Sequence, residues 1–102
     1  MERVLSIDLL NNVKTISTSD VKDVSMFNRH SFQVMVPGAS GAVKIETSND
    51  DAQYFWAQLS GDFDTANSTG IMFYNGALKY IRARNNEVAD SGVHVRYFGN
   101  NV

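Results

Sequence analysis

The two histidines, His30 and His94, are the first candidates for chemistry, because imidazole moves protons most readily near neutral pH. A catalytic histidine usually serves a serine or cysteine nucleophile, but the sequence has no cysteine and no recognisable serine nucleophile motif. His30 falls in an expected turn, and His94 on the outward side of an expected strand. We therefore expect structural or surface roles for both, with no catalytic residue and no enzymatic activity.

Three oxygen-bearing side chains, Asp62, Asp64 and Asn67, lie close together in the longest polar segment, residues 60–70. Calcium prefers such ligands, but a calcium loop also needs a glycine at its sharp bend and a distal glutamate, and both are missing. We expect a solvated acidic loop without a metal or a cofactor. The affinity of these three residues for calcium is left open.

Two other polar stretches have simpler explanations than a site. Residues 49–51, Asn-Asp-Asp, are ordinary turn formers. Residues 67–69, Asn-Ser-Thr, match the acceptor sequence for N-glycosylation, but that modification requires secretion. Charged residues interrupt the N-terminus before a signal-peptide apolar region is complete, so the sequon has no predicted use.

Phe55 and Trp56 are adjacent aromatic residues in an expected strand. Neighbouring side chains of a strand face opposite sides, so only one of the two rings is expected to enter the core. The other is then available for stacking on a sugar or for a subunit interface. Because aromatic residues are enriched at interfaces, we favour the interface.

These residues lie in a predicted hairpin over residues 41–60. Residues 42–47 alternate small or apolar side chains with charged ones, residues 48–51 supply a turn, and residues 54–59 resume as an aromatic strand. A two-stranded ribbon cannot bury its own apolar side, so the rest of the chain must supply an opposing sheet.

Further alternating apolar runs predict strands at residues 21–27, 31–36, 71–74, 78–84 and 93–98, and a hairpin over residues 3–16 that turns at Asn11 and Asn12. In residues 31–36 the expected inward side chains are Phe32, Val34 and Val36. The dipeptide Asn75-Gly76 predicts a tight hairpin between the strands on either side of it. About eight short strands of this kind indicate an all-β fold, an antiparallel β-sandwich of jelly-roll-like or Ig-like type.

The length of 102 residues fits one compact domain. We expect a single β-sandwich domain over residues 20–102, preceded by an N-terminal strand or arm segment over residues 1–19. The arm contains more apolar side chains than a lone ribbon can bury, so we expect a neighbouring copy to order it. The interface candidates are therefore Val4, Leu5, Ile7, Leu9 and Leu10, together with Phe55 and Trp56.

The composition of the sequence limits the kinds of partner that we expect. The formal net charge is -2 and the basic residues are scattered, so no basic stripe is present for nucleic acid. No run approaches the roughly 20 apolar residues of a membrane span. The absence of cysteine excludes disulfides and thiolate metal sites. We expect a soluble protein, synthesised in a host cytoplasm, that binds neither nucleic acid nor membrane.

Four stretches of the sequence form a recurring pattern: FQVMV at 32–36, GAVKIETSNDD at 41–51, WAQL at 56–59 and YIRA at 80–83. Together they resemble small β-sandwich virion proteins of tailed bacteriophages, and the resemblance covers about residues 31–84. Those proteins combine a strand, a hairpin with valine-x-(isoleucine or leucine)-x-x-serine-x-aspartate, a tryptophan strand and a later tyrosine-x-arginine strand. This sequence departs from them at Asp51, where a glycine is common.

The resemblance implies a non-enzymatic virion protein, a capsid decoration, cement or head–tail component. Such a protein forms a homo-oligomer, a trimer being one option, and binds the major capsid protein or other virion proteins. Its location would be the virion. The alternative that the residues leave open is a carbohydrate-binding β-sandwich module of a tail fibre or an enzyme.

Overall fold

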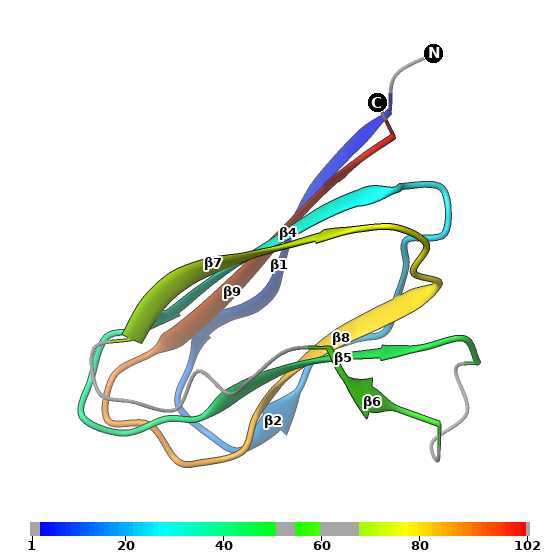
Figure 1. Cartoon of the computed structure of the whole chain (residues 1–102). Coiled ribbons are helices and arrows are strands. Elements are labelled where there is room, and N and C mark those ends of the chain that lie inside the picture. The colour runs from blue at the N-terminus through cyan, green and yellow to red at the C-terminus, as the bar shows by residue number, and fades with distance from the viewer. Residues whose placement is uncertain (1–2, 51–54, 60–67, 102) are drawn as a thin grey trace.

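The computed structural model describes residues 3–50, 55–59 and 68–101, which form two stacked antiparallel sheets (Figure 1). The four-stranded sheet has the order β1 (Val4–Val13), β9 (Val93–Asn100), β4 (Arg29–Val36) and β7 (Ser68–Asn75). The five-stranded sheet has the order β2 (Ser17–Thr18), β8 (Tyr80–Asn85), β5 (Val43–Ser48) and β6 (Ala57–Gln58), and β3 (Lys22–Asp23) also pairs with β8. This arrangement confirms the predicted all-β sandwich.

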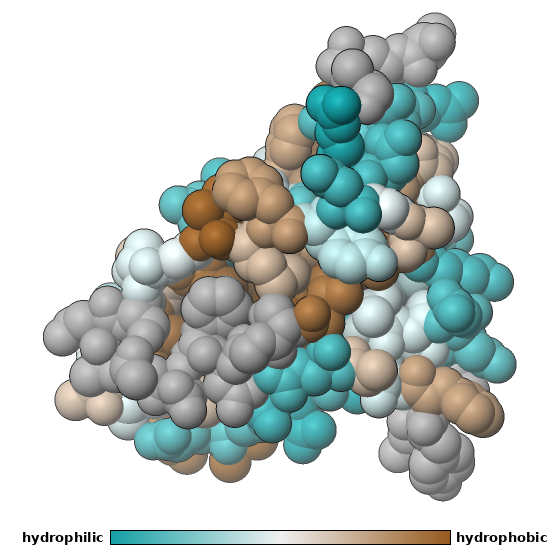
Figure 2. Space-filling model, in the orientation of Figure 1, coloured by the Kyte–Doolittle hydropathy of each residue, from teal (hydrophilic) through white to brown (hydrophobic). Residues whose placement is uncertain are grey.

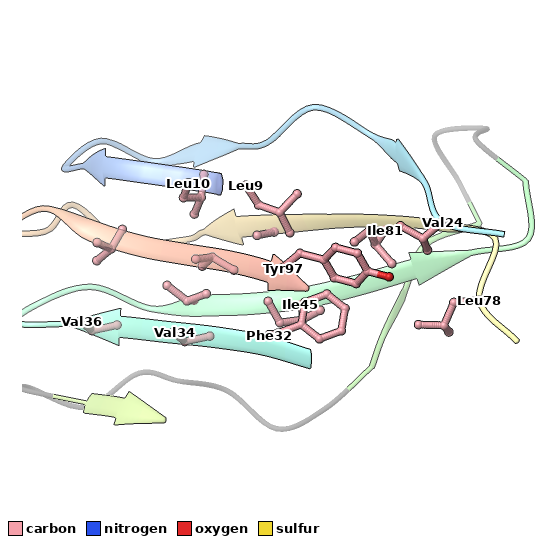
Figure 3. Close-up of a cluster of buried hydrophobic side chains, with 14 of the residues drawn as sticks. Leu9, Leu10, Val24, Phe32, Val34, Val36, Ile45, Leu78, Ile81 and Tyr97 are labelled. Atoms are coloured by element: carbon pink, nitrogen blue, oxygen red, sulfur yellow. The ribbon is translucent and has the colours of Figure 1, made fainter. Parts of the chain in front are cut away.

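The core lies between the two sheets and follows the alternation of the strands. On β4 the inward residues are Phe32, Val34 and Val36, as predicted, and all three are fully buried. Most of the other large side chains that are fully buried come from β9, β5 and β8, namely Val93, Val95, Tyr97, Val43, Ile45 and Ile81, and Val24 adds one from the segment after β3. The rings of Phe32 and Tyr97 lie 5.1 Å apart between their centroids, and in Figure 3 they stand between Val34 on one side and Leu78 on the other.

The N-terminal residues form one long strand, so the predicted hairpin at Asn11 and Asn12 is wrong. β1 pairs with β9 from Val4 to Val13, with register shifts between Asp8 and Leu10 and between Leu10 and Val13. Such bulges bend a strand without reversing it, and Asn12 accommodates the bend with a φ of 55°. Asparagine tolerates a positive φ better than most residues, and here that tolerance serves a bend and not a hairpin turn.

The second predicted hairpin, at Asn75-Gly76, is also wrong. β7 pairs with β4, whereas β8 pairs with β5, so the dipeptide carries the chain from one sheet to the other. Gly76 has a φ of 140°, which only glycine adopts readily, and its N–H donates to the carbonyl oxygen of Asn28 at 2.8 Å. Leu78 then enters the core, which commits the chain to the opposite layer.

Two other predicted strands are shorter than expected. The strand expected at residues 21–27 is reduced to β3, because Asp23 Oδ1 accepts hydrogen bonds from the backbone N–H and the hydroxyl of Ser25 and turns the chain. The hairpin over residues 41–60 is confirmed by the pairing of β5 with β6, but β6 spans only Ala57–Gln58. Its expected start, residue 54, lies with the rest of residues 51–54 outside the described residues.

Candidate functional site: the outer face of the four-stranded sheet

The outer face of the four-stranded sheet presents side chains in four rows that cross the strands. From β7 across β4 and β9 to β1 the rows are Asn75–Arg29–Asn100–Val4, Phe73–Ser31–Phe98–Ser6 and Ile71–Gln33–Arg96–Asp8, and the last row, across three strands, is Thr69–Met35–His94. Five large apolar members of these rows are exposed: Val4, Phe73, Ile71, Phe98 and Met35. Figure 2 shows apolar surface gathered over β7 in this part of the molecule. The face is therefore unusually apolar for a solvated sheet surface.

The first two rows enclose a hollow of about 230 Å³, which we call the Phe73–Phe98 hollow. Phe73 on β7 and Phe98 on β9 both pair with Ser31 on β4, so the two rings stand on either side of a small side chain. Arg29 and Asn100 line the polar end of the hollow, with Asn75 beside them. The hollow thus combines apolar walls with one hydrogen-bonding end.

His30 lies beneath this hollow and is buried, in β4 and not in the expected turn. Its Nε2 lies 3.1 Å from the carbonyl oxygen of Gly76, which can only accept, so Nε2 carries the hydrogen and donates it. Nδ1 is then unprotonated and accepts a hydrogen bond from the Tyr97 hydroxyl at 2.5 Å. Burial lowers the pKa of His30 and raises that of Tyr97, which keeps the imidazole neutral and the phenol protonated.

These two bonds give His30 a structural role. They tie the crossover at Gly76 to the inner side of β9, and so hold β4 and β9 in place beneath the rows that carry Ser31 and Phe98. Gly99 makes room for this arrangement, because a Cβ there would lie 2.3 Å from the Tyr97 hydroxyl. The hollow therefore lies over a fixed support, formed by the hydrogen-bonded residues Tyr97, His30 and Gly76, which we call the frame.

The last two rows border a second hollow, of about 250 Å³, that is more polar. Arg96 donates through Nε to Asp8 Oδ1 at 2.8 Å, and this hydrogen bond lowers the pKa of Asp8. His94 lies on the outward side of β9, as expected, and its Nδ1 accepts a hydrogen bond from the backbone N–H of Asn12 at 3.3 Å. Both contacts fix the bulged part of β1 against β9, so these residues stabilise the edge of the sheet.

The aromatic pair Phe55 and Trp56 lies elsewhere, beside β6 in the other sheet. The guanidinium of Arg82 lies 4.2 Å from the Trp56 ring centroid, and Arg82 Nε donates to Glu46 Oε1 at 2.7 Å. Phe55 is 67% exposed and borders a hollow that also includes Tyr74. Neither ring belongs to the hydrophobic core, so the expectation that one of them would enter it is wrong. The reason is that both precede β6, where strand alternation does not apply.

The structure places the N-terminal interface candidates along β1. Val4 is exposed, Leu5 and Ile7 are half-buried, and Leu9 and Leu10 are buried in the core of this chain. These residues lie in the four-stranded sheet, whereas Phe55 and Trp56 lie next to the edge strand β6 of the five-stranded sheet, so the two groups are not brought together. Their part in an interface stays a prediction.

The calcium candidates Asp62, Asp64 and Asn67 lie outside the described residues. Among the residues that are described, no cluster of three or more histidine, aspartate or glutamate side chains is placed to hold a metal ion.

No protein-family model matches this sequence, and no curated protein sequence matches it significantly. Solved structures do resemble it in fold. The SPBc2 prophage-derived protein YomS aligns with a TM-score of 0.74 at 11% identity, over 98% of this chain and 95% of that chain. A chain of the Bacillus endospore appendages, disulfide-linked pili, aligns with a TM-score of 0.57 at 13% identity, over 100% of this chain and 87% of that chain. The K3 adhesin domain of Lys-gingipain from Porphyromonas gingivalis aligns with a TM-score of 0.57 at 12% identity, over 97% of this chain and 72% of that chain.

At these identities the likeness establishes the fold, which this chain shares with a phage-derived protein of nearly the same extent. The endospore appendages are described as disulfide-linked, whereas this sequence contains no cysteine, so it cannot form that linkage. Across residues 3–50, 55–59 and 68–101, no helix is long and apolar enough to cross a membrane.

Proposed function

We propose that this chain is a non-enzymatic structural protein of a tailed-bacteriophage virion, a capsid decoration or cement protein that forms homo-oligomers and attaches to the capsid surface. Two features support the virion assignment. The first is the sequence resemblance over about residues 31–84. The second is the fold shared with a prophage-derived protein, which spans almost the whole of both chains.

The observation that carries the assembly role is the free edge of β1. β1 pairs only with β9, so one side of this ten-residue strand has no strand partner within the described chain. An unpaired edge offers backbone N–H and C=O groups to a strand from another molecule. The bulges beyond Asp8 interrupt this edge, and the regular part therefore runs from Val4 to Asp8.

The same part of β1 extends away from the body of the molecule, together with the end of β9 (Figure 1). Val4 is 61% exposed there, and Leu5 and Ile7 are only half-buried, so apolar surface accompanies the free edge. Association with a second copy would cover both the edge and these side chains. The five-stranded sheet offers Phe55 as a further contact for the capsid or another virion protein.

The alternative function, carbohydrate binding at Phe55 and Trp56, has less support at that position. Arg82 covers one face of the Trp56 ring, which leaves Phe55 as the only well exposed ring of the pair.

The test compares two substitutions of equally exposed side chains. Val4→Asp places a charge on the regular edge of β1, whereas Ile16→Asp places one outside the strands at a residue that is 59% exposed. In size-exclusion chromatography with light scattering, we expect the wild type and Ile16→Asp to be oligomers and Val4→Asp to be a monomer. A monomeric wild type, or an unchanged oligomer in Val4→Asp, would contradict assembly through this edge.

A further inference from the structure

We propose that the Phe73–Phe98 hollow is a binding site for a saccharide that carries a carboxylate, such as a uronic acid. This inference goes beyond the assembly role and does not depend on it. The hollow lies on the four-stranded sheet, away from Phe55 and Trp56, the residues for which the sequence favoured an interface and left sugar stacking as the alternative.

The first step concerns the two rings. Phe73 and Phe98 pair with Ser31 from opposite sides, so their Cα atoms are two strand spacings apart, roughly 10 Å. Phe73 is 70% exposed and Phe98 is 40% exposed, although nothing in the fold requires apolar side chains at these outward positions. Two aromatic side chains at this separation, with a small residue between them, leave room for one ligand ring whose C–H groups pack against them.

The second step concerns size. A volume of about 230 Å³ lies below the roughly 300–1,000 Å³ that is usual for drug-sized ligands. The hollow therefore fits a single sugar ring, with any second ring of an oligosaccharide outside it, and it is too small to take up a folded partner. The bonds from His30 to Tyr97 and Gly76 fix the strands beneath it, so little ordering is needed on binding.

The third step concerns the polar end, which is the row Asn75–Arg29–Asn100. Arg29 forms no ion pair with any residue that the structure describes, so its charge is uncompensated there. A guanidinium binds a carboxylate through two parallel hydrogen bonds. The side-chain oxygen of Asn100, a residue that lines the hollow, is buried and accepts no hydrogen bond from the described residues, and rotation of this amide toward the hollow on binding would let a ligand hydroxyl satisfy it. An acidic sugar has the groups that this hollow can bind: ring C–H groups for the two phenylalanines, a carboxylate for Arg29 and hydroxyls for Asn100.

The experiment measures binding of digalacturonic acid and of its carboxyl-reduced counterpart, digalactose, to the full chain by isothermal titration calorimetry. We expect saturable binding of the acidic disaccharide and clearly weaker binding of the neutral one. Phe73→Ala should reduce affinity roughly tenfold or more, because it removes one stacking wall. Arg29→Gln should lower the affinity for the acidic sugar to that for the neutral one.

Phe55→Ala is the matched control, because Phe55 is 67% exposed, almost as much as Phe73, and lies in the other sheet. It should leave sugar binding unchanged. Thermal unfolding of each variant checks that the fold is intact. The proposal is overturned if neither sugar binds, if Phe55→Ala abolishes binding while Phe73→Ala does not, or if both sugars bind wild type and Arg29→Gln equally. Light scattering of the same variants reports assembly separately, so failure of one proposal leaves the other standing.

Discussion

Removing the Tyr97 hydroxyl tests the frame beneath the outer face. Tyr97→Phe keeps the ring in its fully buried position and deletes one oxygen, so the hydrophobic contribution to folding hardly changes. The substitution leaves His30 Nδ1 without its donor at a residue that is 2% exposed. A lost hydrogen bond that strands a buried acceptor costs roughly 1–3 kcal/mol, and we expect the free energy of unfolding to fall by that amount.

Urea unfolding provides the measurement, with Tyr74→Phe as the control. The Tyr74 ring also lies near His30, at 6.2 Å between centroids, but the residue is 36% exposed and none of the described residues bonds its hydroxyl. We expect Tyr74→Phe to change stability by about 0.5 kcal/mol or less. The midpoint for Tyr97→Phe should shift at an unchanged slope. Equal losses in the two variants would refute the assignment of the hydrogen bond to Tyr97.

Three further perturbations probe the core and the frame. Ile45→Ala should cost roughly 2–5 kcal/mol, because Ile45 is fully buried and its removal leaves a cavity, whereas Gln33→Ala on the outer face should cost about 0.5 kcal/mol or less. Equal costs by urea unfolding would show that the strand phase is wrong. Gly99→Ala should lower stability by roughly 1–3 kcal/mol, since its Cβ would displace the Tyr97 ring, and an unchanged melting temperature would count against that contact. Burial lowers the pKa of His30, so below pH 6.5 the unfolded chain takes up a proton that the folded chain excludes. The free energy of unfolding should therefore be full above pH 6.5 and decline below it. Urea unfolding that shows a rise in this free energy as the pH falls from about 6.5 to 5 would disprove the expectation.

The strands whose side chains alternate clearly were predictable from the sequence. In β4 and β9 every second residue is buried, and from Phe32 to Val36 each of these buried residues is apolar, so the period of two correctly predicted Phe32, Val34 and Val36 as inward side chains. The same rule places Phe98 outward, as the structure shows. The local pattern was enough to predict these orientations, because the side chains on the apolar side of each strand are the ones that form the core.

The connections were not predictable, because they depend on partners far away in the sequence. The dipeptide Asn75-Gly76 has the composition of a hairpin turn, yet its neighbours find better partners in β4 and β5, and the turn becomes a crossover. The hollow was missed for the same reason. Phe73 meets Ser31 and Phe98 only through the long-range pairing of β7, β4 and β9, which no local signal encodes.

The proposed role as a virion structural protein is tested most directly by sedimentation with phage particles. The full chain, with a protomer mass of 11.3 kDa, is mixed with particles purified without it and centrifuged through a cushion. The proposal predicts that the protein is recovered with the particles in saturable amounts, and that Val4→Asp lowers this recovery while Ile16→Asp does not. A protein that stays in the supernatant at every ratio would contradict the proposal.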